Sequence, residues 1–165
     1  MKELLASLQH DSLFQSWKKQ HPDSYCTHFF CQISPECVPK TPWEIGFYDP
    51  HTGKITVFAE LPKGFEIKPA DDVFRKDQAE VEKLEWEQVK IFVDEAMSRC
   101  QELMPQKFPS EKLGNGFLIL QTFNGVTVWN FSFITQTLKF VNVKINANTG
   151  QEESHDTINL VERKK

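Results

Sequence analysis

Three cysteines and a histidine lie close together in the N-terminal third of the chain and have side chains that could bind a metal. Cys26, His28, Cys31 and Cys37 offer thiolate and imidazole groups, which zinc prefers as ligands. Their spacing lacks the Cys-x2-Cys pair typical of structural zinc sites. On an extended strand, Cys26 and His28 would also point to the opposite face from Cys31. We therefore expect ordinary structural cysteines, and we predict no metal and no other cofactor.

A cysteine activated by a histidine would be a second kind of chemistry. Cys26 or Cys31 could pair with His51 or His155, but the sequence suggests no third residue that would orient the imidazole. The motifs of phosphate-binding loops, serine hydrolases and zinc peptidases are not found in the sequence. We predict no catalytic residues, and we expect a protein that is not an enzyme.

Paired carboxylates occur at Asp71–Asp72 and at Glu152–Glu153. A catalytic acid needs burial beside a group that shifts its pKa. Acids on the polar faces of helices and strands are normally solvated, and we interpret these pairs in the same way.

Aromatic residues give the best indication of a binding surface. Several alternate at strand spacing and are explained by core packing: Trp43, Phe47, Trp129, Phe131 and Phe133. Tyr48, Phe58 and Trp86 fall opposite the predicted core face. Large aromatic side chains on the outer face of a sheet can mark a partner surface, so these three residues are the candidate partner surface. The alternative is that they cover the other half of the molecule.

The N-terminal part of the chain predicts a helix followed by strands. Leucine and aromatic spacing indicates an amphipathic helix over residues 2–20, with a break near His10–Asp11. A strand is expected over residues 24–34 and a proline-rich loop after it. Residues 43–61 are predicted to form a β-hairpin, and residues 63–77 are predicted to be a connector that crosses to the second half.

The C-terminal part predicts a long helix and an antiparallel sheet. Apolar residues at helical spacing indicate a helix from about Asp77 to Leu103, ended by Pro105. Asn124-Gly125 is a strong two-residue hairpin signal between strands at 116–123 and 126–135. Two further strands follow, and the last is polar, as suits a sheet edge.

The same turn sequence occurs twice. Asp49-x-x-Thr52-Gly53 closes the first hairpin, and Asn146-x-x-Thr149-Gly150 precedes the last strand. Asp or Asn stabilises such a turn, and Gly takes the left-handed position. The repeat predicts two related halves: an α-β-β-β half at 1–62, the connector at 63–77, and an α-β-β-β-β half at 78–165. We predict an α+β fold of long helices packed on an antiparallel β-sheet.

The segment Val128–Glu153 resembles the C-terminal part of PepSY-type domains, in which the closing strand runs into Asp/Asn-Ala-x-Thr-Gly. A long helix beside a curved antiparallel sheet is also similar to cystatin-like folds. The PepSY resemblance implies the binding or inhibition of peptidases and an extracytoplasmic setting. Fold resemblance alone does not choose between binding modules and enzymes.

Composition and charge limit the possible partners. The net charge of −4 argues against a nucleic-acid partner, and no apolar stretch is long enough to predict a membrane span. The interrupted N-terminus makes a poor signal peptide, so we expect a cytoplasmic protein. The preferred function is non-enzymatic binding of a protein or peptide partner through the sheet.

Two alternatives stay open. One is a small-molecule-binding protein or enzyme with a pocket between helix and curved sheet, which a cavity lined by Asn130, Ser132, Asn142 or His28 would favour. The other is a homo-oligomerisation module in which edge strands pair, giving a homodimer.

Overall fold

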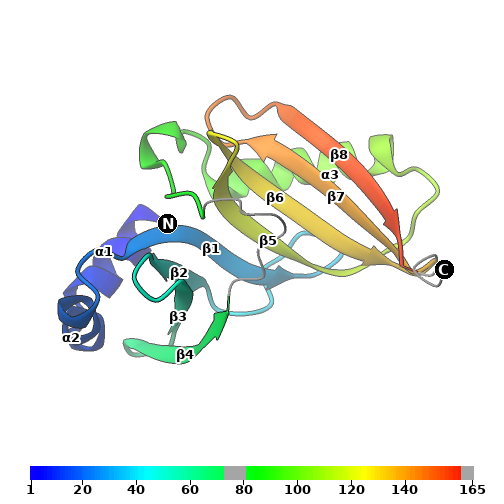
Figure 1. Cartoon of the computed structure of the whole chain (residues 1–165). Helices are drawn as coiled ribbons and strands as arrows, with labels where there is room; N and C mark the ends of the chain where they lie inside the picture. Colours follow the sequence, from blue (N-terminus) through cyan, green and yellow to red (C-terminus); the bar gives the residue numbers. More distant parts are fainter. Residues whose placement is uncertain (73–80, 161–165) are drawn as a thin grey trace. The chain divides into compact units, whose positions relative to one another are not determined.

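The computed structural model describes residues 1–72 and 81–160, and the side chains of 69–72 lie outside the description. The described elements are α1 (Lys2–His10), α2 (Ser12–Gln20), β1 (Tyr25–Ile33), β2 (Glu44–Asp49), β3 (Lys54–Glu60), β4 (Phe65–Asp72), η1 (Trp86–Gln88), α3 (Val93–Lys107), β5 (Leu113–Phe123), β6 (Val126–Thr135), β7 (Lys139–Asn146) and β8 (Glu152–Asn159). The strands pair in the order β4-β3-β2-β1-β5-β6-β7-β8 in one sheet (Figure 1).

The predicted fold class is therefore wrong. Strands dominate the described residues, and the longest helix among them, α3, has 15 residues. The fold is mostly a meandering antiparallel sheet with short helices, not long helices packed on a sheet. The chain separates into two units, which comprise residues 1–30 with 42–84 and residues 31–41 with 85–165.

The first unit contains α1, α2 and the sheet from β1 to β4. Asp11 has extended backbone angles and accepts a hydrogen bond from Leu13 N through Oδ1 (2.8 Å). This N-cap ends α1 and starts α2, so the predicted break at His10–Asp11 is confirmed. Phe14 and Trp17 of α2 pack against the rings of Phe47 and Phe58, with ring centroids 5.0–5.8 Å apart.

Strand β4 lies where the sequence predicted a connector. Phe65 to Asp72 pair antiparallel with β3, although the segment contains charges and Pro69. Because β4 ends the strand order, a proline that cannot donate a ladder hydrogen bond is tolerated there. The start of the predicted long helix at Asp77 lies outside the described residues.

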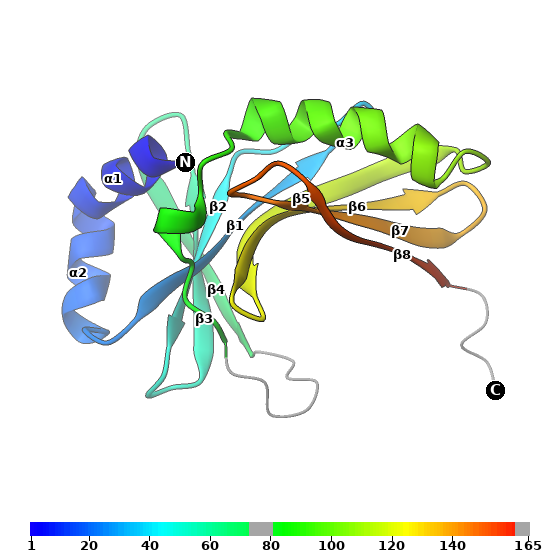
Figure 2. The same ribbon diagram turned by 90° about the horizontal axis from the view of Figure 1, so that it is seen from above.

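The second unit contains α3 and the four-stranded meander β5–β8. Figure 2 shows α3 lying along one face of these strands. Trp129, Phe131, Phe133, Val141 and Val143 are all fully buried. The strands alternate as predicted, and β8 ends the strand order, so its predicted edge position is confirmed.

A strap formed by residues 85–92 replaces the N-terminal part of the predicted long helix. Three of its backbone N–H groups bond to β5 and to the residue after β7: Glu85 N donates to Thr122 Oγ1 (3.0 Å), and Lys90 N and Ile91 N both donate to Ala147 O (2.8 Å each). The indole of Trp129 donates to Ile91 O (3.1 Å). A helix needs those N–H groups for its own carbonyls, so the helix begins only at Val93. Pro105 lies inside its last turn, and the helix ends at Lys107.

The two copies of the turn are locally alike. Gly53 and Gly150 have φ of 68° and 73°, and their N–H groups donate to Asp49 O (2.8 Å) and Asn146 O (2.9 Å). Their places in the meanders differ, however. The first joins the second and third strands after its helices, and the second joins the third and fourth strands after α3. The shared turn therefore does not mark equivalent positions in two pseudo-symmetric halves.

Candidate binding site on the β5–β8 sheet

A cavity of about 370 Å³ lies on the β5–β8 sheet and is built from the side chains opposite the buried aromatic residues. Cross-strand register explains its composition. Phe117, Ser132, Asn142 and Asp156 follow one another across β5, β6, β7 and β8. One register step further along, Asn130 pairs with Lys144. Because side chains alternate between the faces of a sheet, the site uses the face that does not carry Trp129.

The Asn142 amide is the centre of this site. Its Nδ2 lies 2.8 Å from Ser132 Oγ and 3.1 Å from Phe131 O, and it also donates to Asn130 Oδ1. Lys144 Nζ donates to Asn142 Oδ1 (3.1 Å). An amide nitrogen carries two hydrogens, and three oxygens share them here. The cluster therefore offers both hydrogen-bond donors, from Ser132, Asn130 and Lys144, and acceptors on one surface.

Charge at the site is balanced and lies at its edge. Lys144 Nζ is 3.7 Å from Asp156 Oδ2, and the Asp156 side chain is 61% exposed. Ser132 and Asn142 lie deeper and are buried. Apolar side chains form the walls: the rings of Phe117 and Phe140 lie 5.7 Å apart, and Ile158 adds an aliphatic surface. The site therefore combines a neutral polar floor, apolar walls and one ion pair.

The sequence predicted part of this site. Asn130, Ser132 and Asn142 do come together in a cavity, as the pocket alternative required. Three details differ from that prediction: the cavity is not between helix and sheet, His28 is not among its lining residues, and its apolar walls were not singled out. The signal for Phe117 and Phe140 was present, because both alternate with buried neighbours in their strands.

His28 instead packs in the first unit, opposite Gly46 on β2. The Thr27 hydroxyl donates to Gly46 O (3.2 Å) and lies 2.9 Å from His28 Nδ1, so Nδ1 carries the hydrogen of the neutral ring. Burial lowers the pKa of His28 to about 4, although the nearby Glu44 carboxylate raises it. The imidazole is thus a neutral, hydrogen-bonded strand residue.

The four cysteines are all free and buried. Burial raises the pKa of Cys26 and of Cys31 to about 12, so neither is an activated nucleophile. Cys37 lies against Cys100, with the sulfur atoms 3.6 Å apart. Within residues 1–72 and 81–160, no three His, Cys, Asp or Glu side chains gather in a way that could hold a metal ion.

The predicted aromatic partner surface is placed differently from the expectation. Phe58 is fully buried and Tyr48 is 6% exposed, so both belong to the interior of the first unit. Trp86 lies in η1 and is half-buried. Tyr48 and Phe58 therefore do not present the exposed rings that the prediction assumed, and a partner contact at Trp86 stays a prediction.

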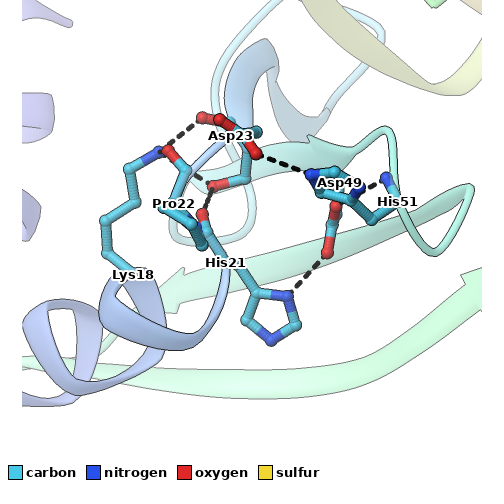
Figure 3. A network of polar contacts seen from close by, with 7 residues as sticks. Lys18, His21, Pro22, Asp23, Asp49 and His51 are labelled. Carbon is cyan, nitrogen blue, oxygen red and sulfur yellow. Dashed lines mark hydrogen bonds and ion pairs between the residues drawn. The ribbon is translucent and has the colours of Figure 1, made fainter.

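A second polar cluster joins the end of α2 to the β2–β3 turn in the first unit (Figure 3). Each of its two His–Asp pairs joins the segment after α2 to the β2–β3 region. His21 Nδ1 lies 2.7 Å from Asp49 Oδ2, and His51 Nε2 lies 2.6 Å from Asp23 Oδ2. The hydrogen bond from His21 lowers the pKa of Asp49, and the hydrogen bond to Asp23 raises the pKa of His51.

The contacts of this cluster have a structural role, because they tie the segment after α2 to the β2–β3 turn. Lys18 Nζ donates to Pro22 O (3.0 Å) and to Ser24 O (2.5 Å), and the Ser24 hydroxyl donates to His21 O (2.7 Å). The hydroxyl is thus bonded to a carbonyl and not to an imidazole. The cysteine–histidine pair that the sequence allows but does not predict is not seen among these residues: His51 bonds to Asp23, and His155 bonds to Glu152 (2.5 Å) in the second unit.

Comparisons with known proteins give the fold and no more. No protein family and no curated protein matches the chain. A crystal structure of a protein from Clostridium difficile 630, described as a "putative lipoprotein", is similar with a TM-score of 0.51 and 11% sequence identity. The similarity covers 88% of this chain and 90% of that chain. The resemblance to PepSY-type domains and the cytoplasmic location both stay predictions.

None of the helices formed by the described residues combines the length and the apolar character that crossing a membrane requires.

Proposed function

We propose that this chain is a non-enzymatic binding protein that engages a peptide segment of a partner protein through the β5–β8 cavity. The observation that carries the proposal is the row formed by Phe117, Ser132, Asn142 and Asp156, one residue from each of four neighbouring strands. The row supplies polar and apolar contacts on one surface, which is typical of recognition sites.

The balance of donors and acceptors favours a peptide. The Asn130 and Ser132 oxygens that lie against the Asn142 amide keep further lone pairs for N–H groups of a ligand. A peptide backbone supplies such groups together with carbonyls that the Ser132 hydroxyl and Lys144 can reach. The walls at Phe117 and Phe140 suit one apolar peptide side chain, and the Lys144–Asp156 pair suits a ligand of low net charge.

The same contacts favour binding over covalent catalysis. A serine nucleophile needs a general base within hydrogen-bond distance. Ser132 Oγ instead accepts a hydrogen from the Asn142 amide at 2.8 Å, and an amide nitrogen does not take up a proton at neutral pH. This arrangement positions the hydroxyl without activating it.

The test uses a random-peptide phage library selected on the full-length protein. Enriched peptides are synthesised, and their affinities are measured by fluorescence polarisation. Asn142→Leu should weaken binding about 5- to 150-fold, because leaving buried hydrogen-bond partners unsatisfied costs on the order of 1–3 kcal/mol. Asn148→Leu is the matched control, since Asn148 is exposed in the β7–β8 turn and should leave affinity unchanged.

Circular dichroism checks that Asn142→Leu still folds. If it does not, Phe140→Ala, which shortens one wall of the cavity, replaces it. Peptides that bind wild type and Asn142→Leu equally well would refute the site, and failure to enrich any peptide would refute the peptide class.

A small-molecule ligand is the second candidate, because the cavity volume of about 370 Å³ falls within the range of small-molecule pockets. Fragment screening by two-dimensional NMR separates the two candidates. Fragments that shift Asn130 and Asn142 amide signals, in a protein that enriches no peptide, would favour this function over peptide binding.

A further inference from the structure

The loop after β1 is held onto α3 inside the second unit. Ser34 organises the loop: Cys37 N donates to Ser34 O (2.9 Å), and Ser34 N donates to Val38 O (2.8 Å). The loop is fixed to the helix by Gln101, whose Nε2 donates to Glu36 O (2.7 Å). These bonds set the position of Cys37 relative to the helix.

Cys37 meets Cys100 of α3 at this contact. The two sulfur atoms are 3.6 Å apart, and both residues are buried, with exposures of 2% and 0%. Cys37 has a φ of 60°, a left-handed conformation that is uncommon for residues other than glycine. The backbone therefore holds this side chain against the helix despite a local conformational cost.

We propose that Cys37 and Cys100 are a redox-modification site at which peroxide closes an intramolecular disulfide between the loop and α3. A disulfide has an S–S length of about 2.05 Å, so the sulfur atoms must approach by roughly 1.5 Å. Side-chain rotation supplies such a movement. The inference concerns the second unit alone and does not depend on the peptide-binding proposal.

The reaction balances with one molecule of hydrogen peroxide. The Cys37 thiolate attacks one peroxide oxygen, the O–O bond breaks, and the released hydroxide takes up a proton to become water. This step leaves a sulfenic acid on Cys37. The Cys100 sulfur then attacks the Cys37 sulfur, the S–O bond breaks, and the departing hydroxide leaves as water with the Cys100 proton. Two thiols are oxidised and one peroxide is reduced to two waters.

The surroundings give a small oxidant access to Cys37. A cavity of about 230 Å³ is lined by Cys37 together with Met104, Pro105 and Phe108, and hydrogen peroxide is scarcely larger than water. The hydrogen bond with Cys100 lowers the pKa of Cys37, whereas the hydrogen bond with Cys37 and burial raise the pKa of Cys100. Cys37 is thus the thiolate that reacts first, and Cys100 resolves it.

The other two cysteines serve as internal controls. Cys26 and Cys31 are buried, and burial raises the pKa of each to about 12. Both should stay reduced while the pair closes. The expected product is therefore one specific disulfide with two thiols remaining.

The experiment treats the reduced full-length protein with hydrogen peroxide, quenches it, unfolds it and alkylates the remaining thiols. Intact mass should show the loss of two hydrogen atoms and two alkylated cysteines instead of four, and peptide mapping should join Cys37 to Cys100. The oxidised form should melt higher, by on the order of 10 °C, because the bond closes a loop of 63 residues.

Variants locate the bond. Cys37→Ser and Cys100→Ser should each abolish the mass loss and the rise in melting temperature, whereas Cys31→Ser should keep both. Four alkylated cysteines after peroxide treatment would overturn the inference. So would a disulfide that involves Cys26 or Cys31, or oxidation of Cys37 that ends as sulfinic or sulfonic acid.

Discussion

Acid should destabilise the first unit through His28, because its imidazole is neutral in the folded chain. Its pKa is about 4 when folded, against an ordinary value of 6.5. Between these two values the unfolded chain binds a proton at this residue and the folded chain does not. The free energy of unfolding therefore falls as pH decreases through this window, and it is fully retained above pH 6.5.

The size of the effect follows from the two pKa values. A difference of about 2.5 pKa units corresponds to about 3 kcal/mol, at roughly 1.36 kcal/mol per unit. About 2 kcal/mol of this should be lost by about pH 5. Partners lower the pKa values of the Asp49 and Glu111 carboxylates. Their contributions to the free energy of unfolding are therefore lost at lower pH, and they change little between pH 7.5 and pH 5.

The assay is urea unfolding of wild type and His28→Phe at pH 7.5 and pH 5. Phenylalanine keeps a ring against Gly46 and does not titrate. Wild type should lose about 2 kcal/mol more than the variant between the two pH values, and NMR should show His28 titrating near pH 4. Equal losses in both proteins, or a His28 pKa near 6.5, would refute this account of the half-buried imidazole.

Three further predictions concern single positions. Gly46→Ala should lower the free energy of unfolding by about 1–3 kcal/mol, because a Cβ there would lie 2.1 Å from His28 Cε1. Urea unfolding should show that adding His28→Ala restores part of this loss. Additive effects in the double variant would contradict the contact. Asp23→Asn should lower the pKa of His51, measured by NMR, because it weakens the hydrogen bond that raises it. In wild type this stabilisation is complete below about pH 6.5 and is lost as pH rises through the raised pKa; an unchanged His51 titration would argue against the pair. Gly125→Ala should cost about 1–2 kcal/mol, since Gly125 has a φ of 77° and open space beside it; an unchanged melting temperature would refute conformational strain as the reason for glycine.

The turns and the faces of the strands could be predicted from the sequence because they depend on local chemistry. Asn124-Gly125 adopts positive φ at both residues, as its composition requires. Alternation correctly separated Asn130 and Ser132 from the buried Trp129 and Phe131. The polar floor of the cavity follows from that alternation.

The remaining features depend on partners that are distant in the sequence. The apolar spacing before α3 is helical, but Glu85, Lys90 and Ile91 donate their N–H groups to Thr122 and Ala147. No local pattern reveals those acceptors. Residues 65–72 resemble a connector and form an edge strand only because β3 pairs with them. The contact between Cys37 and Cys100 joins residues 63 positions apart, so it appears only in the folded chain.

The strap also determines how this unit responds to mechanical load. A pulling force applied to the chain ahead of Glu85 first meets the Glu85–Thr122 bond and the Gln88 side chain, which bonds to both Gly125 O and Thr127 N. The paired bonds at Ala147 O come next along the chain. These hydrogen bonds therefore bear the force before α3 does. The helix should stay packed on the sheet until they have broken.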